Sequence, residues 1–358
     1  MTNQVTPEYT LYHDPLKYYN AMLDDIAHAK SYIYLETYRF NNDTIGIRFR
    51  DALTNKSKQG VKIKLLMDSW GTSLPKNFFS DIQKNGGEIR YFQKLRIVWD
   101  FFTRNHKRNH RKLIVIDDHI TYIGSANLTD YSLNWRESIL RMKSDIALPF
   151  KKVFLEHFEM FKKYVFEKKI QVRRITHENF EIIRDIPSLT KQRIRRRYIE
   201  LIKSARQEVV IETPYFLPSR YLRNALSDAA KAGVDVNVVM PKNSDVGIVD
   251  LLRNRYLGPL FKNSIKLHFY KPHNLHAKMI LVDKKVFSLG SPNFDYRSFR
   301  FQHEIIIVGS AEAIVRQMDS HMQETLKSSE PFEYERWLSR SRIQKVFEWM
   351  LLPFRHLL

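Results

Sequence analysis

Hydrophobic and polar positions along the chain follow two periods, one typical of strands and one typical of helices. Residues 31–40 and 61–68 are rich in apolar and β-branched side chains and predict strands. Between them, residues 44–59 carry apolar side chains at helical spacing and end at Gly60, which is typical of a helix C-terminus. The same criteria predict helices at 22–29, 77–85, 150–166 and 311–328, and strands at 88–92 and 305–310. This alternation predicts a layered α/β fold.

The pattern of the first half returns in the second half. The segment AKSYIYLETYRF (29–40) is similar to ARQEVVIETPYF (205–216), and RDALTNKSKQGVKIKLLMD (50–68) is similar to RNALSDAAKAGVDVNVVMP (223–241). A repeat of this length indicates two duplicated domains rather than a solenoid. We expect an N-terminal domain at 1–166, a basic connector at 167–197, a C-terminal domain at 198–330 and an amphipathic tail at 331–358.

A longer motif occurs once in each half. The first copy, HRKLIVIDDHITYIGSAN, spans 110–127, and the second, HAKMILVDKKVFSLGSPN, spans 276–293. In both copies a His is followed at +2 by Lys, at +7 by Asp, at +14 and +15 by Gly-Ser and at +17 by Asn. Six fixed positions at about 5% each match by chance about once in 10⁸ starts, so two matches in one chain are not accidental.

Each motif opens a buried strand, because an apolar run (LIVI or MILV) follows the first three residues. Side chains two positions apart on a strand point to the same face. His110 and Lys112 therefore emerge together, as do His276 and Lys278. An imidazole can act as a nucleophile or a general acid near neutral pH, and a Lys ammonium suits a phosphate oxygen. These residue types predict phosphodiester chemistry.

The remaining motif positions are candidates for the same site. The Gly-Ser-x-Asn segments would return small hydrogen-bonding groups to it, namely Ser125, Asn127, Ser291 and Asn293. Asp117 and Asp283, grouped with the catalytic candidates of each motif, lie an odd number of positions after the His. On an unbroken strand they cannot share its face, so we expect them to brace a turn or orient a neighbour.

The two motifs resemble the paired HxKxxxxDxxxxxxGSxN motifs of the phospholipase D superfamily. Glu137 and Glu304 follow them where members of that superfamily often have a glutamate. Over nearly the whole chain, segments such as LETYRF, ETPYF and GSPNFDYRSF are similar to bacterial cardiolipin synthases of the shorter kind, which have no N-terminal transmembrane helices. The resemblance implies two phospholipase D-like α-β-α sandwich domains with mixed sheets, packed about a pseudo-two-fold axis with one shared active site.

The resemblance also implies a mechanism. His110 would attack phosphorus and form a phosphohistidine, and His276 would act as general acid and base, although sequence symmetry alone does not decide between them. The non-bridging oxygens would be held by Lys112, Lys278, Asn127 and Asn293. Glu137 and Glu304 would each hydrogen-bond an imidazole, and which glutamate serves which histidine is open.

A metal centre is not expected from these residues. His106 and His110 are four apart, but positive charge surrounds them, from Lys107, Arg108, Arg111 and Lys112, and no acidic cluster of ligand type lies nearby. The resemblance likewise implies metal-independent catalysis without a cofactor.

The composition is that of a globular protein, with 43% hydrophobic and 27% charged residues and no Cys. The net charge of +20 attracts polyanions, either nucleic acid or a membrane surface rich in anionic lipid. No apolar run reaches the ~20 residues that span a bilayer, and the N-terminus does not have the pattern of a signal peptide. We therefore expect a monomeric peripheral protein on the cytoplasmic face of the membrane.

Two segments combine aromatic with basic residues. One is 94–109, directly before the first motif, and it is either a surface lid, a membrane-facing lip or a nucleic-acid-binding lip. The other is 341–358, which is either a packed terminal helix or a helix lying in the headgroup layer. The candidates for membrane contact in these segments are Trp99, Phe101, Phe102, Trp349 and Phe354.

Three functions follow from these features. The leading hypothesis, which the resemblance supplies, is a phosphatidyltransferase that makes cardiolipin from phosphatidylglycerol or a related phospholipid. The second is a phospholipase D or nuclease that hydrolyses phosphodiesters at the same site. The third, of another class, is a non-catalytic module that binds membranes or nucleic acid, and the two complete motifs argue against it.

Overall fold

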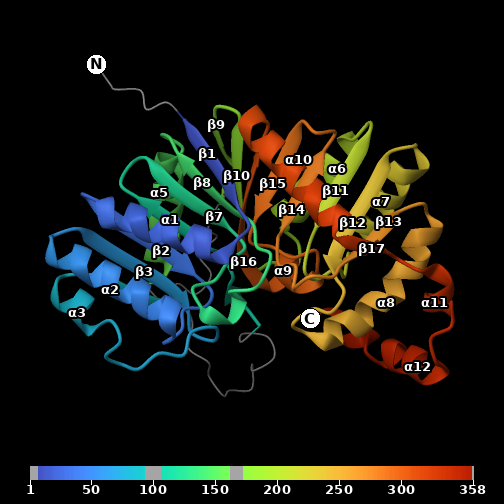
Figure 1. Ribbon diagram of the computed structural model, residues 1–358, viewed down its shortest axis with the longest axis horizontal. Helices are drawn as coiled ribbons and strands as arrows, with labels where there is room; N and C mark the ends of the chain where they lie inside the picture. The colour runs from blue at the N-terminus through green and yellow to red at the C-terminus, as the bar shows by residue number, and fades with distance from the viewer. Residues whose placement is uncertain (1–6, 93–105, 162–171, 357–358) are drawn as a thin grey trace.

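The computed structural model describes residues 7–92, 106–161 and 172–356, and the two halves of the chain lie side by side in it (Figure 1). The strands of the first half are β1 (Glu8–Tyr12), β2 (Tyr32–Thr37), β3 (Lys62–Asp68), β4 (Glu88–Phe92), β5 (Arg108–Asn109), β6 (Leu113–Ile116), β7 (Ile120–Gly124) and β8 (Ile139–Lys143). Its helices are α1 (Pro15–His28), α2 (Thr44–Lys58), α3 (Ser80–Lys84), the 3₁₀ turn η1 (Asp130–Ser132) and α5 (Ala147–Met160).

The second half has a matching set of elements. Its strands are β9 (Ile175–His177), β10 (Phe180–Asp185), β11 (Glu208–Glu212), β12 (Asp235–Pro241), β13 (Lys266–Tyr270), β14 (Met279–Val282), β15 (Val286–Gly290), β16 (Gln302–Gly309) and β17 (Ser329–Pro331). Its helices are α6 (Arg193–Ser204), α7 (Arg220–Lys231), α8 (Gly247–Lys262), α9 (Tyr296–Phe301), α10 (Glu312–Lys327), α11 (Tyr334–Leu338), α12 (Arg342–Met350) and the 3₁₀ turn η2 (Leu352–His356).

Both sheets have the same strand order, which confirms the predicted duplication. The first sheet runs β1-β8-β7-β6-β2-β3-β4, and the second contains the equivalent path β10-β16-β15-β14-β11-β12-β13. In each path the last three strands are parallel and the others pair antiparallel, so both sheets are mixed. The additional strands β9 and β17 extend the two ends of the second sheet, and β5 pairs with β16.

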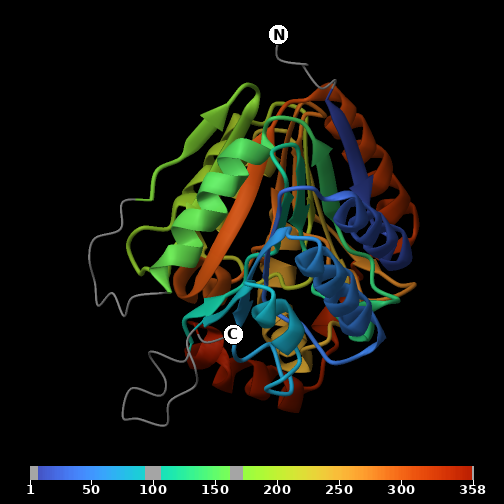
Figure 2. The same cartoon turned by 90° about the vertical axis from the view of Figure 1, so that its left-hand side faces the viewer.

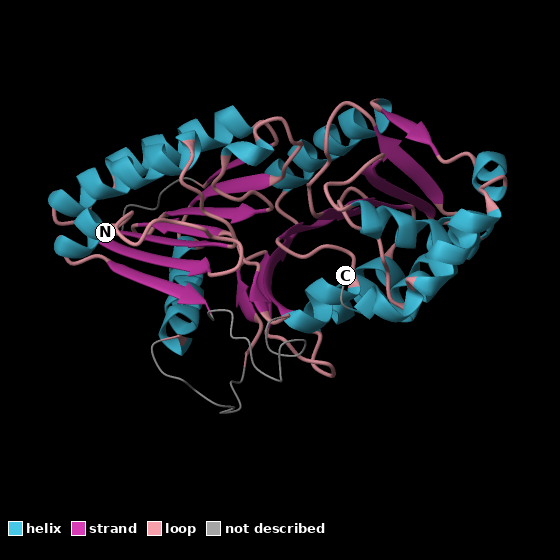
Figure 3. Cartoon of the chain, turned by 90° about the horizontal axis from the view of Figure 1, so that it is seen from below, coloured by secondary structure: helices cyan, strands magenta, loops and turns pink. Residues whose placement is uncertain are grey.

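Helices cover the sheets in layers, as an α-β-α arrangement requires. Side chains of α1, α2 and α3 form one apolar core with the first sheet, and side chains of α6, α7 and α8 form another with the second. A third core lies between the halves and combines α5 and α10 with strands of both sheets. Figure 2 shows α5, in green, alongside β16, in orange, and Figure 3 shows strands enclosed by helices in both halves.

The segment 167–197, expected as a connector, contains part of the second sheet. The strand β10 pairs antiparallel with β16 and occupies the place that β1 has in the first sheet. Its apolar run is only Ile182-Ile183 between charged residues, which is why the sequence pattern did not indicate a strand. The basic run at 191–197 leads into α6, where Arg197 forms an ion pair with Glu181.

Of the five residues expected to contact a membrane, the structure describes two. Trp99, Phe101 and Phe102 lie outside the described residues. Trp349 and Phe354 are described, and both side chains are more than half exposed. Each helix in the described part of the chain is too short or too polar to span a membrane.

Candidate active site

A pocket of about 200 Å³ is lined by residues of both halves, and both motif histidines contribute to it. His110 and Asn127 come from the first motif, and His276 and Asn293 come from the second. Two segments that are far apart in the sequence therefore meet at one cavity.

Backbone pairing between the halves fixes the start of each motif. The strand β5 pairs parallel with β16, and the His110 N–H donates to the His303 carbonyl at 3.1 Å. On the other side, the His276 N–H donates to the Arg136 carbonyl at 2.8 Å, and the Arg136 N–H donates to the Asn274 carbonyl at 2.9 Å. Each histidine is thus anchored to the residue that precedes the glutamate of the opposite half.

Each imidazole is held by a glutamate of the other half. His110 Nδ1 lies 3.0 Å from Glu304 Oε1, and His276 Nδ1 lies 2.9 Å from both carboxylate oxygens of Glu137. An Nδ1–H that donates to a carboxyl group leaves Nε2 without that proton and with a lone pair. The sequence left open which glutamate serves which histidine. The pairing is crossed between the halves, because His110 pairs with Glu304 and His276 pairs with Glu137.

The motif serines support these glutamates. Ser291 Oγ donates to Glu304 Oε2. Ser125 hydrogen-bonds Glu137 and adds to the larger effects of His276 and Lys278, which lower the pKa of that carboxyl group against the effect of burial. Ser125 Oγ also accepts the N–H of Ser138 at 2.8 Å. In this structure the serines contact the glutamates and orient them, and the glutamates in turn hold the imidazoles that line the pocket.

The motif glycines are required by close strand packing. A Cβ on Gly124 would lie 2.0 Å from the Ser138 carbonyl oxygen, and a Cβ on Gly290 would lie 2.2 Å from the Ile305 carbonyl oxygen. Only glycine allows the backbone after the motif strand to approach the segment that carries the glutamate. The Gly-Ser pair therefore places the serine hydroxyl against that carboxyl group.

Both motif lysines are buried, and each ammonium donates to the carbonyl of its own histidine. The distance from Lys112 Nζ to the His110 oxygen is 2.6 Å, and the distance from Lys278 Nζ to the His276 oxygen is 2.8 Å. Burial lowers the pKa of Lys112 to about 7 and that of Lys278 to about 8. A phosphate anion bound between the histidines would favour the charged forms again, because opposite charge offsets desolvation.

The side-chain oxygens of the two motif asparagines, Asn127 and Asn293, differ in their hydrogen bonding. Asn127 Oδ1 accepts the backbone N–H of Arg39 at 3.3 Å, whereas Asn293 Oδ1 is buried with no hydrogen-bond partner. Arg39 and Arg297 also line the pocket and add positive charge to it. The same wall also includes Asp245 and Asp295. The guanidinium and amide groups are the part of the wall that suits an anionic ligand.

Asp117 and Asp283 lie at the opposite ends of their strands from the histidines. Each occupies a turn with positive φ, 49° and 51° respectively. The Asp117 carboxylate accepts the backbone N–H groups of Lys30, Ser31 and Tyr32, and Asp283 accepts those of residues 206–208. Because each carboxylate accepts several backbone N–H groups there, both aspartates brace the beginnings of β2 and β11.

Replacing Asp117 by Ala is expected to lower stability and leave the chemistry intact. The substitution removes the acceptor for three backbone donors, which should lower the free energy of unfolding by about 1–3 kcal/mol. Denaturant unfolding measures this loss, and activity per folded molecule should equal that of the native protein. A variant with native stability and no activity would contradict the bracing role.

Sequence patterns did not reveal two buried networks behind the histidines. In the first, His157 Nδ1 lies 2.5 Å from Glu36 Oε1, and His157 Nε2 lies 3.0 Å from His303 Nδ1. Glu36 also accepts a hydrogen bond from Asn109, the neighbour of His110. The network therefore connects the residues that precede the first histidine and its glutamate.

The second network occupies the equivalent place, but Arg136 stands where the first has His303, and Leu275 stands where the first has Asn109. His321 Nε2 lies 3.0 Å from Glu212 Oε2, and Arg136 Nη2 contacts both His321 and Glu324. Arg136 precedes Glu137 in the way that His303 precedes Glu304. One sequence feature could have indicated these networks. Glu36 in LETYRF and Glu212 in ETPYF lie in buried strands, where a carboxylate needs a hydrogen-bond partner.

The pKa values of Glu304 and Glu137, the glutamates in front of these two networks, shift in opposite directions. Burial raises the pKa of Glu304 to about 8. Burial acts on Glu137 too, but His276 and Lys278 outweigh it and leave the pKa of Glu137 below its ordinary value. Desolvation and the neighbouring lysine charges hold the pKa of His110 well below its usual range. The His110 side thus favours neutral groups, and the His276 side favours an ionised carboxylate.

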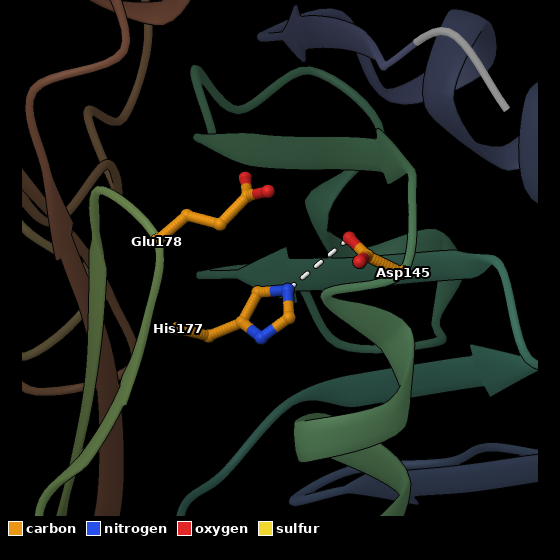
Figure 4. Close-up of side chains that lie close together, drawn as sticks. All are labelled: Asp145, His177 and Glu178. Carbon is orange, nitrogen blue, oxygen red and sulfur yellow. Dashed lines mark hydrogen bonds and ion pairs between the residues drawn. The ribbon is translucent and has the colours of Figure 1, made fainter. Parts of the chain in front are cut away.

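A further side-chain cluster lies on the surface, away from the pocket. Asp145, His177 and Glu178 bring potential metal-ligand atoms within 4.8 Å of one another (Figure 4). His177 Nε2 already contacts Asp145 Oδ1 at 3.1 Å, which links the β9–β10 hairpin to the turn before α5. Asp145 and Glu178 are exposed, so we assign the cluster only this link.

Comparisons with known proteins agree with this arrangement. The family model described as "Cardiolipin synthase, PLD-like domain" matches residues 22–162 and 198–326, one segment in each half. The chain is 31% identical over 354 residues to a cardiolipin synthase of Clostridium perfringens (strain SM101), covering 94% of this chain and 74% of that one. It is also 31% identical over 353 residues to the major cardiolipin synthase ClsA of Bacillus subtilis (strain 168), with 94% and 73% covered.

Among solved structures, the phosphatidylserine synthase of Haemophilus influenzae Rd KW20 matches the fold. The TM-score is 0.75 at 12% sequence identity, and the match covers 100% of this chain and 96% of that one. The duplicated sheets described above are therefore shared with a solved protein. With one family segment in each half and relatives similar over most of their length, the chain belongs to the cardiolipin synthase family of proteins with PLD-like domains.

Proposed function

We propose that this protein is a phosphatidyltransferase that moves a phosphatidyl group from one phosphatidylglycerol to the hydroxyl of a second, giving cardiolipin and glycerol. The observation that carries the proposal is the meeting of His110 and His276 at one pocket, each with its Nδ1 held by a glutamate. Relatives that bear the name cardiolipin synthase supply the substrate class.

The reaction proceeds in two displacements at phosphorus. In the first, Nε2 of one imidazole attacks, the bond from phosphorus to the glycerol oxygen breaks, and the other imidazolium gives its proton to that oxygen. In the second, the now neutral imidazole takes the proton of the incoming hydroxyl. That oxygen attacks phosphorus and breaks the phosphorus–nitrogen bond, which restores the first histidine.

We infer that His110 is the nucleophile and His276 the general acid and base. A nucleophilic imidazole must be neutral, and the lowered pKa of His110 beside a carboxyl group of raised pKa favours that state. A general acid must carry a proton. Burial lowers the pKa of His276 as well, but the ionised Glu137 opposes this shift and stabilises the imidazolium, whereas the pKa of His110 falls well below its usual range. The family resemblance gives the same assignment.

The remaining motif residues act on the phosphoryl oxygens or on the histidines. Lys112 and Lys278 supply positive charge where negative charge develops, and Asn127 and Asn293 supply amide N–H donors. Ser125 and Ser291 act through the glutamates. Asp117 and Asp283 act on the fold.

The protein works on the membrane surface as a peripheral enzyme on the cytoplasmic face. Its net charge of +20 favours an anionic leaflet, and phosphatidylglycerol is itself anionic. Both histidines and both glutamates come from one chain, so a monomer contains the complete site.

A direct assay separates the candidate functions. Purified protein is incubated with phosphatidylglycerol vesicles and, separately, with single-stranded DNA, and the products are resolved by mass spectrometry. Cardiolipin with an equal amount of glycerol is the expected result. Phosphatidic acid alone would identify a phospholipase D, cleaved DNA alone would identify a nuclease, and binding without any product would identify a non-catalytic module.

A further inference from the structure

The helix α12 exposes its apolar face and buries a charged one. Its apolar residues follow the spacing i, i+3, i+4 and i+7 and share one side of the helix. These residues are Ile343, Val346, Phe347 and Met350, and each is more than half exposed. Trp349 extends the same surface, with 66% of its area accessible. A helix at the surface of a soluble protein ordinarily turns this face inward.

The inward face of α12 is held by an ion pair. The Glu348 side chain is fully buried, and its Oε1 lies 3.0 Å from Arg340 Nε. Arg340 Nη2 donates to the other carboxylate oxygen at 3.2 Å, and Gln344 also contacts Glu348. Turning the helix would separate this pair and leave a buried charge without a partner, which is costly. The outward direction of the apolar face is therefore built into the fold.

The helix is fastened to the half of the molecule that carries the second motif. Trp337 of α11 donates its indole N–H to the Asn254 carbonyl of α8 at 2.8 Å, and its ring stacks against Arg340. Figure 1 shows α11 and α12 beside α8 at the lower edge of this half. Both α11 and α12 contact α8, and these contacts place the exposed surface relative to the pocket.

The end of the chain leads from α12 toward the active-site pocket. The turn η2 packs on α9, and the Arg355 guanidinium lies 6.0 Å from the ring centre of Tyr296 in that helix. The next residue, Arg297, lines the pocket. On the other side of this region, Val246 and Val249 at the start of α8 line it as well. The exposed apolar surface of α12 is thus connected to the wall of the pocket through η2 and α9.

We propose that α12 and η2 form a membrane foot, which inserts its apolar side chains into the headgroup layer of an anionic bilayer and sets the pocket against the lipid. The foot consists of residues 342–356. The proposal rests on the proposed function, since a phospholipid substrate must be reached within a bilayer. Basic side chains border the apolar surface, among them Arg342 and Lys345, and they complement anionic headgroups.

A second copy of the chain is the competing occupant of this surface. A helix of nine residues is roughly 13 Å long and cannot by itself bury the ~1,200 Å² or more of a stable interface. The excess of positive charge on the chain also opposes self-association through this region. A lipid surface has neither limitation.

Vesicle binding tests the foot independently of catalysis. The full-length protein and the double variant Phe347→Ser, Trp349→Ser are sedimented with vesicles of phosphatidylcholine and phosphatidylglycerol in equal amounts. Leu189→Ser serves as the matched control, because Leu189 is 67% exposed and outside the foot. The double variant should bind vesicles about tenfold more weakly or worse, while the control binds like the native chain.

Further readouts separate the possible outcomes. Turnover of a water-soluble phosphodiester should be equal in all three proteins, and only cardiolipin formation on vesicles should fall in the double variant. Loss of vesicle binding without any native cardiolipin synthesis would support the foot and refute the proposed function. Unchanged vesicle binding in the double variant would overturn the foot. So would a native dimer, measured by light scattering, that this variant converts to monomer.

Discussion

Replacing His110 by Asn is expected to abolish cardiolipin formation, with a loss of about 10⁴-fold or more in rate. The substitution removes the nucleophilic Nε2, and His276, the other imidazole that lines the described pocket, is assigned the role of general acid and base. Asn keeps a polar side chain of similar length, so the contact with Glu304 is preserved as far as possible. Product formation from phosphatidylglycerol vesicles measures the loss, and thermal unfolding verifies that the variant is folded.

The two histidines can be told apart by the leaving group. A phosphodiester of p-nitrophenol needs no protonation of its leaving oxygen, because the phenolate is already stable. His276→Asn should therefore still release one equivalent of p-nitrophenol in a burst and retain the phosphoryl group on His110. His110→Asn should release none. A burst in His110→Asn that is absent in His276→Asn would reverse the assigned roles.

Replacing Glu137 by Gln is expected to cost about 10²- to 10³-fold in rate near pH 7, far more than the same change at Glu304. Glu137 has a lowered pKa and is ionised at this pH, so Gln removes the charge that stabilises the His276 imidazolium. Glu304 has a pKa of about 8 and is mostly protonated there. Gln is close in shape and charge to that neutral carboxyl group, so the Glu304→Gln variant should retain most of its activity.

The pH dependence provides a control for this comparison. Above pH 8, native Glu304 loses its proton and becomes charged, whereas Gln cannot, so the difference between Glu304→Gln and the native protein should grow with pH. The Glu137→Gln defect should already be complete at pH 6, since its carboxylate is ionised there. Equal defects for the two variants at every pH would show that the glutamates are electrostatically equivalent.

The sequence predicted the elements that depend on local patterns. The helix ending at Gly60 and the strand at 61–68 appear as α2 and β3, and the repeated order of strands appears as two sheets of the same topology. Period and turn residues suffice for such elements because neighbouring positions determine them. The helix expected at 22–29 begins seven residues earlier, at Pro15, after a capping contact from Asp14.

Features that depend on the contact between the halves could not be predicted. Glu137 and Glu304 were identified as partners for imidazoles, but the exchange between halves requires the relative position of two sheets. His157 and His321 belong to no motif, and only their place on α5 and α10 brings them to buried glutamates. The apolar spacing of the tail was visible, but the direction of its apolar face depends on the burial of Glu348.

The crossed pairing of histidine and glutamate has a consequence for how the two copies can change over time. Loss of the Glu137 carboxylate in the first copy disables His276 of the second copy, so neither copy can decay while the other keeps working. Both copies must therefore keep their site residues together, although the residues on the surfaces of the two halves can change independently. Two polypeptides that each carry one half should regain activity only when mixed, and defects at His276 and Glu137 should behave as lesions in the same functional unit.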